Sequence, residues 1–229
     1  MKKSFSIIVA LVALMAACAC PSFAIVRHNT TISGTNGAGY LMSPTVIDQV
    51  WLAPATASAT VFKSAVSVSS ASLVTGSTAW TLAVADFGDI VSPRNVVAKL
   101  TYSAGTSTTT ASAVLFISGY NQEGAATTES ITFSTITTQG VGNVAWSSIT
   151  SMTVAGYSGN NVDANVLISI GNGVQMGLVD NVSSSADIIK VLENGAVSTT
   201  YTVNYLYDTI TFATAPNSSN NKEVIYIKE

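Results

Sequence analysis

The stretch that decides the fold is residues 117–133, "ISGYNQEGAATTESITF". Its centre, "NQEG", is rich in residues that form turns, and apolar and polar residues alternate on either side of it. Alternation with a period of two residues is typical of a β-strand with one buried face. The stretch therefore predicts a β-hairpin whose turn contains Glu123.

Short runs of the same character recur along the chain. They are rich in Val, Ile, Thr and aromatic residues, and Gly, Asn, Ser and Pro separate them. The leader aside, no window shows the apolar period of a helix. This spacing predicts an all-β chain with an immunoglobulin-like β-sandwich over residues 59–178. The runs are residues 59–68, 79–85, 95–103, 112–120, 129–136, 149–157 and 164–170.

Two further segments flank the sandwich. Residues 25–58 are punctuated by Gly, Asn and Pro and predict an extended N-terminal arm with one short strand near Val46–Leu52. Residues 179–229 predict a small C-terminal β-hairpin module. In it, Asn194-Gly195 favours a type I′ turn, and two alternating strands meet at a tight turn near Asp208. A unit of this size is too small to be secure alone, so we expect it to pack on the sandwich or on a neighbouring subunit.

Residues 1–24 have the pattern of an export signal peptide. "MKK" is followed by the apolar run "SIIVALVALMAACA", and "SFA" fits cleavage after Ala24. Cleavage there removes Cys18 and Cys20 and leaves no thiol for disulfides, catalysis or metal binding. The alternative is a lipid anchor on Cys18, because "LMAAC" resembles a bacterial lipobox. No later run approaches the length of a membrane span. The sequence predicts a secreted or cell-surface protein.

The composition limits the partners. Only 9% of residues are charged and 48% are apolar, which is too apolar for a disordered chain. Loss of Lys2 and Lys3 with the leader turns nine basic residues into seven, against twelve acidic ones, and changes the net charge from −3 to −5. Nucleic-acid binding is therefore not expected, because it needs clustered cations.

Few residues suit catalysis or metal binding. His28, the one histidine, lies in the predicted arm, away from any candidate nucleophile. Glu123 and Glu129 suggest paired acids, but a polar turn with solvated strand ends explains them better. Asp86 and Asp89 suggest a calcium loop but lack its spacing, which favours turn-forming aspartates. We therefore predict no enzyme activity, no catalytic, cofactor-binding or metal-binding residue, and no cofactor.

The tryptophans allow two interpretations. Trp51, Trp80 and Trp146, with the tyrosines, suggest a platform for stacking sugars. The positions of Trp80 and Trp146 beside strands favour burial in the core or at its rim.

Four segments occur in an order that resembles a tailed-phage virion structural protein family of β-sandwich proteins. They are "PRNVVAKLTY" (93–102), residues 117–133, "WSSITSMTVAG" (146–156) and "ISIGNGVQMGL" (168–178). The resemblance covers residues 46–178, and residues 195–216 resemble a small β-module of phage fibre and capsid-surface proteins. It implies a structural subunit of a capsid, tail or fibre and carries over no catalytic residues. The export leader departs from this pattern and points to a relative that assembles outside the membrane.

The sequence thus predicts a non-enzymatic subunit that self-associates, through strand edges and exchange of the N-terminal arm, into a virion-like assembly, an extracellular filament or a surface layer. Its expected partners are copies of itself. The alternative is a secreted adhesin or carbohydrate-binding module that recognises cell-surface glycans. A third hypothesis is a hydrolase that uses carboxylates.

Overall fold

The computed structural model describes residues 24–29, 45–67, 80–83, 89–102, 111–134, 139–159 and 166–228. Within these ranges the chain is almost entirely antiparallel β-structure, with one short 3₁₀-helix, η2 (Ser185–Asp187). The all-β prediction is confirmed. The strands are β1 (Ala24–Asn29), β2 (Thr45–Trp51), β3 (Ser58–Ser67), β4 (Trp80–Thr81), β5 (Asp89–Tyr102), β6 (Ala111–Asn121), β7 (Ala126–Ser134), β8 (Gly140–Val141), β9 (Trp146–Gly159), β10 (Val166–Gly177), β11 (Ile188–Glu193), β12 (Ala196–Val197), β13 (Tyr201–Asn204), β14 (Thr209–Phe212) and β15 (Lys222–Lys228).

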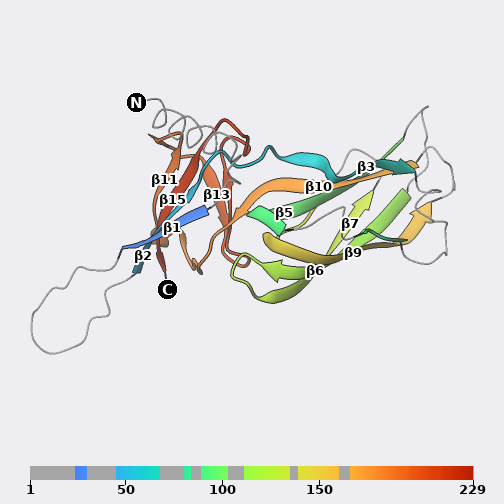
Figure 1. Ribbon diagram of the computed structural model, residues 1–229, viewed down its shortest axis with the longest axis horizontal. Coiled ribbons are helices and arrows are strands. Elements are labelled where there is room, and N and C mark those ends of the chain that lie inside the picture. Colours follow the sequence, from blue (N-terminus) through green and yellow to red (C-terminus); the bar gives the residue numbers. More distant parts are fainter. Residues whose placement is uncertain are drawn as a thin grey trace, which may run out of the picture.

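The strands form two sheets in an elongated molecule (Figure 1). The larger sheet has the order β13-β14-β10-β5-β9-β6-β7, and β3, β4 and β8 pair with β10, β9 and β5 respectively. It folds over on itself, because β5 pairs with β9 near its start (Arg94 opposite Trp146) and with β8 further along (Val97 opposite Val141). In Figure 1, β3, β10 and β5 lie in one layer and β9, β6 and β7 in the other.

The first hydrophobic core fills the space between these layers. Alternate residues of each strand point into it, such as Val96, Ala98 and Leu100 on β5. Because successive side chains of a strand point to opposite faces, this alternation fixes the register of every strand against the core. The result is a sandwich-like fold, as the sequence predicted.

The hairpin predicted for residues 117–133 is present. β6 pairs with β7 from Ser112 opposite Ser134 to Tyr120 opposite Ala126. The turn is closed by Asn121, whose side-chain oxygen accepts hydrogen bonds from the backbone N–H groups of Glu123 (3.2 Å) and Ala125 (2.8 Å).

The smaller sheet brings the two ends of the chain together. Its order is β1-β2-β15-β11-β12, so the strand predicted at Val46–Leu52 is found as β2 and lies beside the C-terminal strand β15. The β11–β12 turn has Asn194 and Gly195 at φ of 53° and 78°, which confirms the predicted type I′ geometry. Asp208, at φ 47°, ends the turn between β13 and β14.

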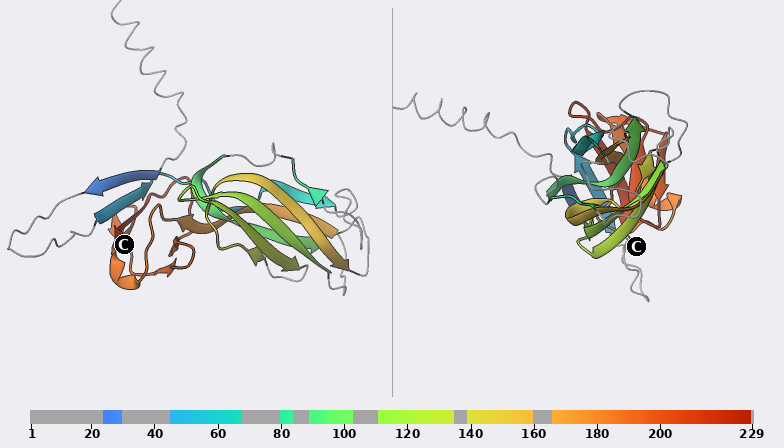
Figure 2. Two further views of the ribbon diagram at one scale, coloured as in Figure 1. Left: turned by 90° about the horizontal axis from the view of Figure 1, so that it is seen from below. Right: turned by 90° about the vertical axis from the view of Figure 1, so that its right-hand side faces the viewer.

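The second core lies between this sheet and one end of the large sheet. β2 contributes Ile47 and Trp51, both fully buried, and β10 contributes Met176 at its end. Trp51 meets Phe212 of β14 edge to face, with ring centroids 5.7 Å apart. β10 therefore runs through both halves of the molecule (Figure 2). β14 pairs with it at Met176. The predicted arm and the predicted C-terminal module share this core with the end of β10.

Candidate functional site

The two glutamates of the hairpin have different surroundings. Glu123 is exposed in the turn, where desolvation and the charge of Asp208 raise its pKa. Glu129 lies opposite Ile117, on the inward side of β7, and is half-buried. Its Oε1 accepts hydrogen bonds from the backbone N–H groups of Asn143 (2.6 Å) and Val144 (3.3 Å), while burial raises its pKa.

The prediction that Glu129 is a solvated strand-end charge is therefore wrong. The side chain holds the 142–145 loop against β7 because it satisfies two backbone donors there. The two glutamates do not pair: Glu123 has Asp208 and Asp180 among its charged neighbours, and Glu129 contacts the loop before β9.

The side chains of Arg94 and Asn95 form hydrogen bonds with the backbone of β10 at Gly173 and Gln175. The guanidinium of Arg94 is buried and donates to the carbonyl oxygens of Ala55 (Nη1, 2.5 Å) and Gly173 (Nη2, 2.6 Å). Burial lowers its pKa to about 10. The side chain of Asn95 donates to the Gly142 carbonyl (2.8 Å) and accepts from the Gln175 N–H (3.0 Å). The segments 93–102 and 168–178 are thus joined by a buried network of hydrogen bonds.

A second network of hydrogen bonds is centred on the fully buried side chain of Gln49 in β2. Its Nε2 donates to the Gly177 carbonyl (2.9 Å), and its Oε1 accepts from the Val179 N–H (3.1 Å) and the Tyr226 hydroxyl (3.3 Å). The Tyr226 hydroxyl is the donor in this last bond, and burial raises its pKa. Gln49 thereby ties the N-terminal segment to the end of β10.

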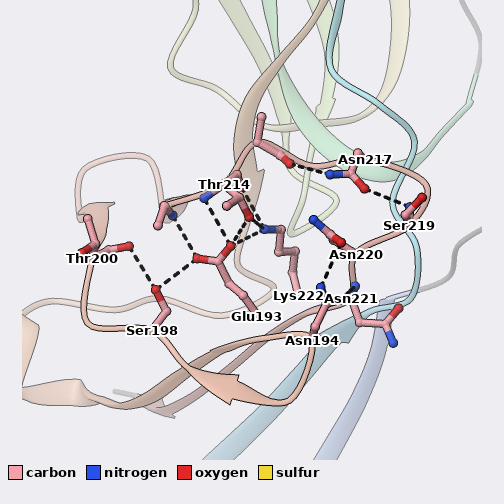
Figure 3. A network of polar contacts seen from close by, with 12 residues as sticks. Glu193, Asn194, Ser198, Thr200, Thr214, Asn217, Ser219, Asn220, Asn221 and Lys222 are labelled. Atoms are coloured by element: carbon pink, nitrogen blue, oxygen red, sulfur yellow. Dashed lines mark hydrogen bonds and ion pairs between the residues drawn. The ribbon is translucent and has the colours of Figure 1, made fainter.

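The third polar cluster surrounds a buried ion pair between Lys222 and Glu193 (Figure 3). Lys222 Nζ lies 2.5 Å from Glu193 Oε2 and donates to the Thr214 carbonyl (2.8 Å), above the ring of Phe212. Burial alone would raise the pKa of Glu193. Hydrogen bonds from Lys222, Thr214 and Ser198 outweigh it, and the pKa falls to about 2.

These contacts indicate that the cluster of Figure 3 is structural. Both charges are compensated, and the carboxylate also accepts from the backbone N–H groups of Ala213 (3.1 Å) and Thr214 (3.2 Å). A general base needs a free lone pair aimed at a substrate, and these oxygens already accept from five donor groups of four residues.

The remaining residues considered from sequence are spread through the fold. Trp51 and Trp146 are fully buried and Trp80 packs partly buried against the first core, as the burial interpretation predicts. His28 lies in β1 opposite Ile47, Asp89 begins β5, and Asp86 is outside the described residues. In the described part of the chain, no three His, Cys, Asp or Glu side chains gather as metal ligands.

Sequence reasoning missed the buried roles of Arg94, Gln49 and Lys222. A signal was available for Arg94 and Gln49, because each is a polar residue beside apolar strand residues in a chain with few charges. Lys222 lies between Asn221 and Glu223 and gave no such signal. Polar side chains in such positions are buried only with hydrogen-bond partners.

β1 lies at one edge of the small sheet, and β12 lies at the other. β1 pairs with β2 from Ala24 opposite Trp51 to Asn29 opposite Val46, and it is the outermost strand of that sheet. Fifteen residues, 30–44, join it to β2. An outermost strand leaves one row of backbone N–H and C=O groups available to another chain.

No family model, no curated protein and no solved structure matches this chain. The resemblance to phage structural proteins therefore stays a prediction. No helix in the ranges that the structure describes has the length and apolar character needed to cross a membrane.

Proposed function

We propose that the protein is a non-enzymatic structural subunit that self-associates outside the cell by exchanging its N-terminal strand. The observation that carries the proposal is the placement of β1, which lies at a sheet edge, pairs with β2 and is joined to it by residues 30–44. Fifteen residues span up to about 50 Å when extended, which is enough to reach an adjacent copy. β1 of one copy then pairs with β2 of the next.

The charge distribution supports this proposal. A chain with 9% charged residues has little like-charge repulsion to oppose association. By contrast, β2 is fixed within its own subunit, because Gln49 and the buried Trp51 hold it and Arg94 holds the Ala55 carbonyl beyond it. Exchange is thus confined to β1, and each subunit keeps a complete second core.

Negative-stain microscopy and size-exclusion chromatography of the purified protein test the assembly, and mass spectrometry of its N-terminus distinguishes cleavage after Ala24 from lipidation of Cys18. Ordered oligomers or filaments are expected. Monomers at all concentrations would contradict the proposal.

Cysteine pairing tests the exchange itself. Arg27 and Asp48 are partners in the register of β1 and β2. With Cys18 and Cys20 replaced by serine, differently tagged Arg27→Cys and Asp48→Cys subunits are assembled together, and a mixed disulfide dimer is expected. The control pair is Lys190→Cys with Ile225→Cys, which lie opposite one another on β11 and β15. This pair should link only within one chain. Disulfides confined to an Arg27→Cys/Asp48→Cys double variant would rule out exchange.

A further inference from the structure

The outward face of β9, β6 and β7 is a surface of hydroxyl groups without charged side chains. The register places these residues in rows across the three strands, and Thr81 of β4 extends one row beside Thr153. Figure 2, left, is seen from the side on which these strands lie. The rows are Ala155, Val114 and Thr132; Thr153, Phe116 and Ser130; Ser151, Ser118 and Thr128; and Ser148, Tyr120 and Ala126.

Two aromatic side chains, Phe116 and Tyr120, also belong to this hydroxyl face. Phe116 and Tyr120 are 49% and 45% exposed, whereas the other aromatic side chains in the described part of the sandwich are buried or partly buried. They lie four residues apart on β6, which separates them by roughly 13 Å along the strand. Ser118 lies between them and is flanked by Ser151 and Thr128 in its row.

This combination suits a neutral sugar chain. The flat face of a pyranose ring presents C–H groups that stack on an aromatic ring, while its hydroxyls exchange hydrogen bonds with Ser and Thr. An acidic glycan or a nucleic acid would find no cation among the residues in these rows. A protein partner is disfavoured because the cores of protein interfaces are depleted in serine.

We propose that the hydroxyl face binds an extended neutral polysaccharide, with Phe116 and Tyr120 each stacking on one sugar and Ser118 facing the segment between them. A single site of this kind binds weakly, because each stacking contact is small. Copies repeated in an assembly strengthen the binding through multivalency.

The test is retention of the purified protein on insoluble cellulose and chitin, and retardation in gels containing mixed-linkage β-glucan or galactomannan. We expect binding to at least one of these and none to alginate or heparin. Phe116→Ala and Tyr120→Ala should each weaken binding at least tenfold, and the double variant should not bind. Val197→Ala is the control, because Val197 is 63% exposed on β12, which belongs to the smaller sheet. It should bind as the unchanged protein does.

Three results would overturn the proposal: no retention on any neutral polysaccharide, equal retention of the Phe116→Ala/Tyr120→Ala variant, or loss of oligomers in that variant. The last result would assign the face to contacts between copies. Strand exchange is measured separately by the mixed disulfide dimer, so failure of glycan binding and failure of assembly are distinguishable.

Discussion

Arg94 and Gly173 are joined by a 2.6 Å hydrogen bond from Nη2 to the glycine carbonyl, 79 residues along the chain. The same guanidinium reaches the carbonyl of Ala55, so one side chain connects the segment before β3, the start of β5 and the end of β10. Both partners are neutral carbonyls. A buried cation held in this way depends on the planar, forked arrangement of its N–H groups.

Arg94→Lys and Arg94→Met should therefore both destabilise the protein. Lysine keeps the charge but cannot reach two carbonyls in different directions, and methionine leaves both carbonyls unpaired. Each is expected to lower the free energy of unfolding by about 3 kcal/mol, measured by urea denaturation. Lys99→Met, a half-exposed position on the same strand, is the control and should change it by less than about 0.5 kcal/mol. An Arg94→Met variant as stable as the unchanged protein would show that these hydrogen bonds do not stabilise the fold.

The ion pair of Glu193 and Lys222 should make the fold acid-sensitive. Since the folded-state pKa of Glu193 is about 2, below its ordinary value, its stabilisation is fully present above pH 4.5. It is lost as the pH falls from there toward 2. After allowance for solvent screening, the loss is on the order of 1–2 kcal/mol.

Urea denaturation at pH 7, 4 and 2.5 measures this effect. Glu193→Gln should be less stable at pH 7 and should show a shallower acid dependence. Glu223→Gln, on the same strand as Lys222, should keep the acid dependence of the unchanged protein. If Glu193→Gln declined with acid as steeply as the unchanged protein, another group would be responsible.

Glu129 should depend on its hydrogen bonds and not on its charge. The amide oxygen of Glu129→Gln can still accept from the N–H groups of Asn143 and Val144, and the substitution removes a buried charge. We expect a change within about 1 kcal/mol at pH 7, against a loss of about 2–3 kcal/mol for Glu129→Ala. Because burial raises its pKa, ionised Glu129 costs stability, and that cost disappears as the pH falls through the raised pKa. Loss of polysaccharide hydrolysis on Glu129→Gln would instead revive the hydrolase hypothesis.

Gly171→Ala should weaken the pairing of β3 with β10. A Cβ there would lie 1.9 Å from the carbonyl oxygen of Ser58 and 2.5 Å from the carbonyl carbon of Ala59, both backbone atoms of β3. The expected cost is about 1–3 kcal/mol, with faster proteolysis within residues 58–67. The control is Gly124→Ala, which meets nothing within 4 Å but has φ +80°. Its strain should cost about 1 kcal/mol and leave the proteolysis of β3 unchanged.

The sequence predicted those elements whose structure depends on neighbouring residues alone. The hairpin of residues 117–133 and the Asn194-Gly195 turn follow from alternation and turn residues, and both were predicted. The face of Glu129 could not be predicted, because shifting the alternation by one residue exchanges the two faces of a strand. Which strand pairs with β2 could not be predicted from the sequence either. Its pairing with β15 joins residues far apart in sequence, and no local pattern specifies such a choice. Arg94 and Asn95 lie in the segment 93–102 that carries the resemblance, but their partners on β10 appear only when the strands are packed.

The position of β2 beside β15 has a consequence for biosynthesis. Thr45–Trp51 leave the ribosome early, but their neighbour Lys222–Lys228 is the last strand to be made. Until the chain is finished, Ile47 and Trp51 have no complete core to enter. In the proposed exchange, β1 of one copy could pair with β2 of another during this interval, because β2 is not yet held in its own subunit.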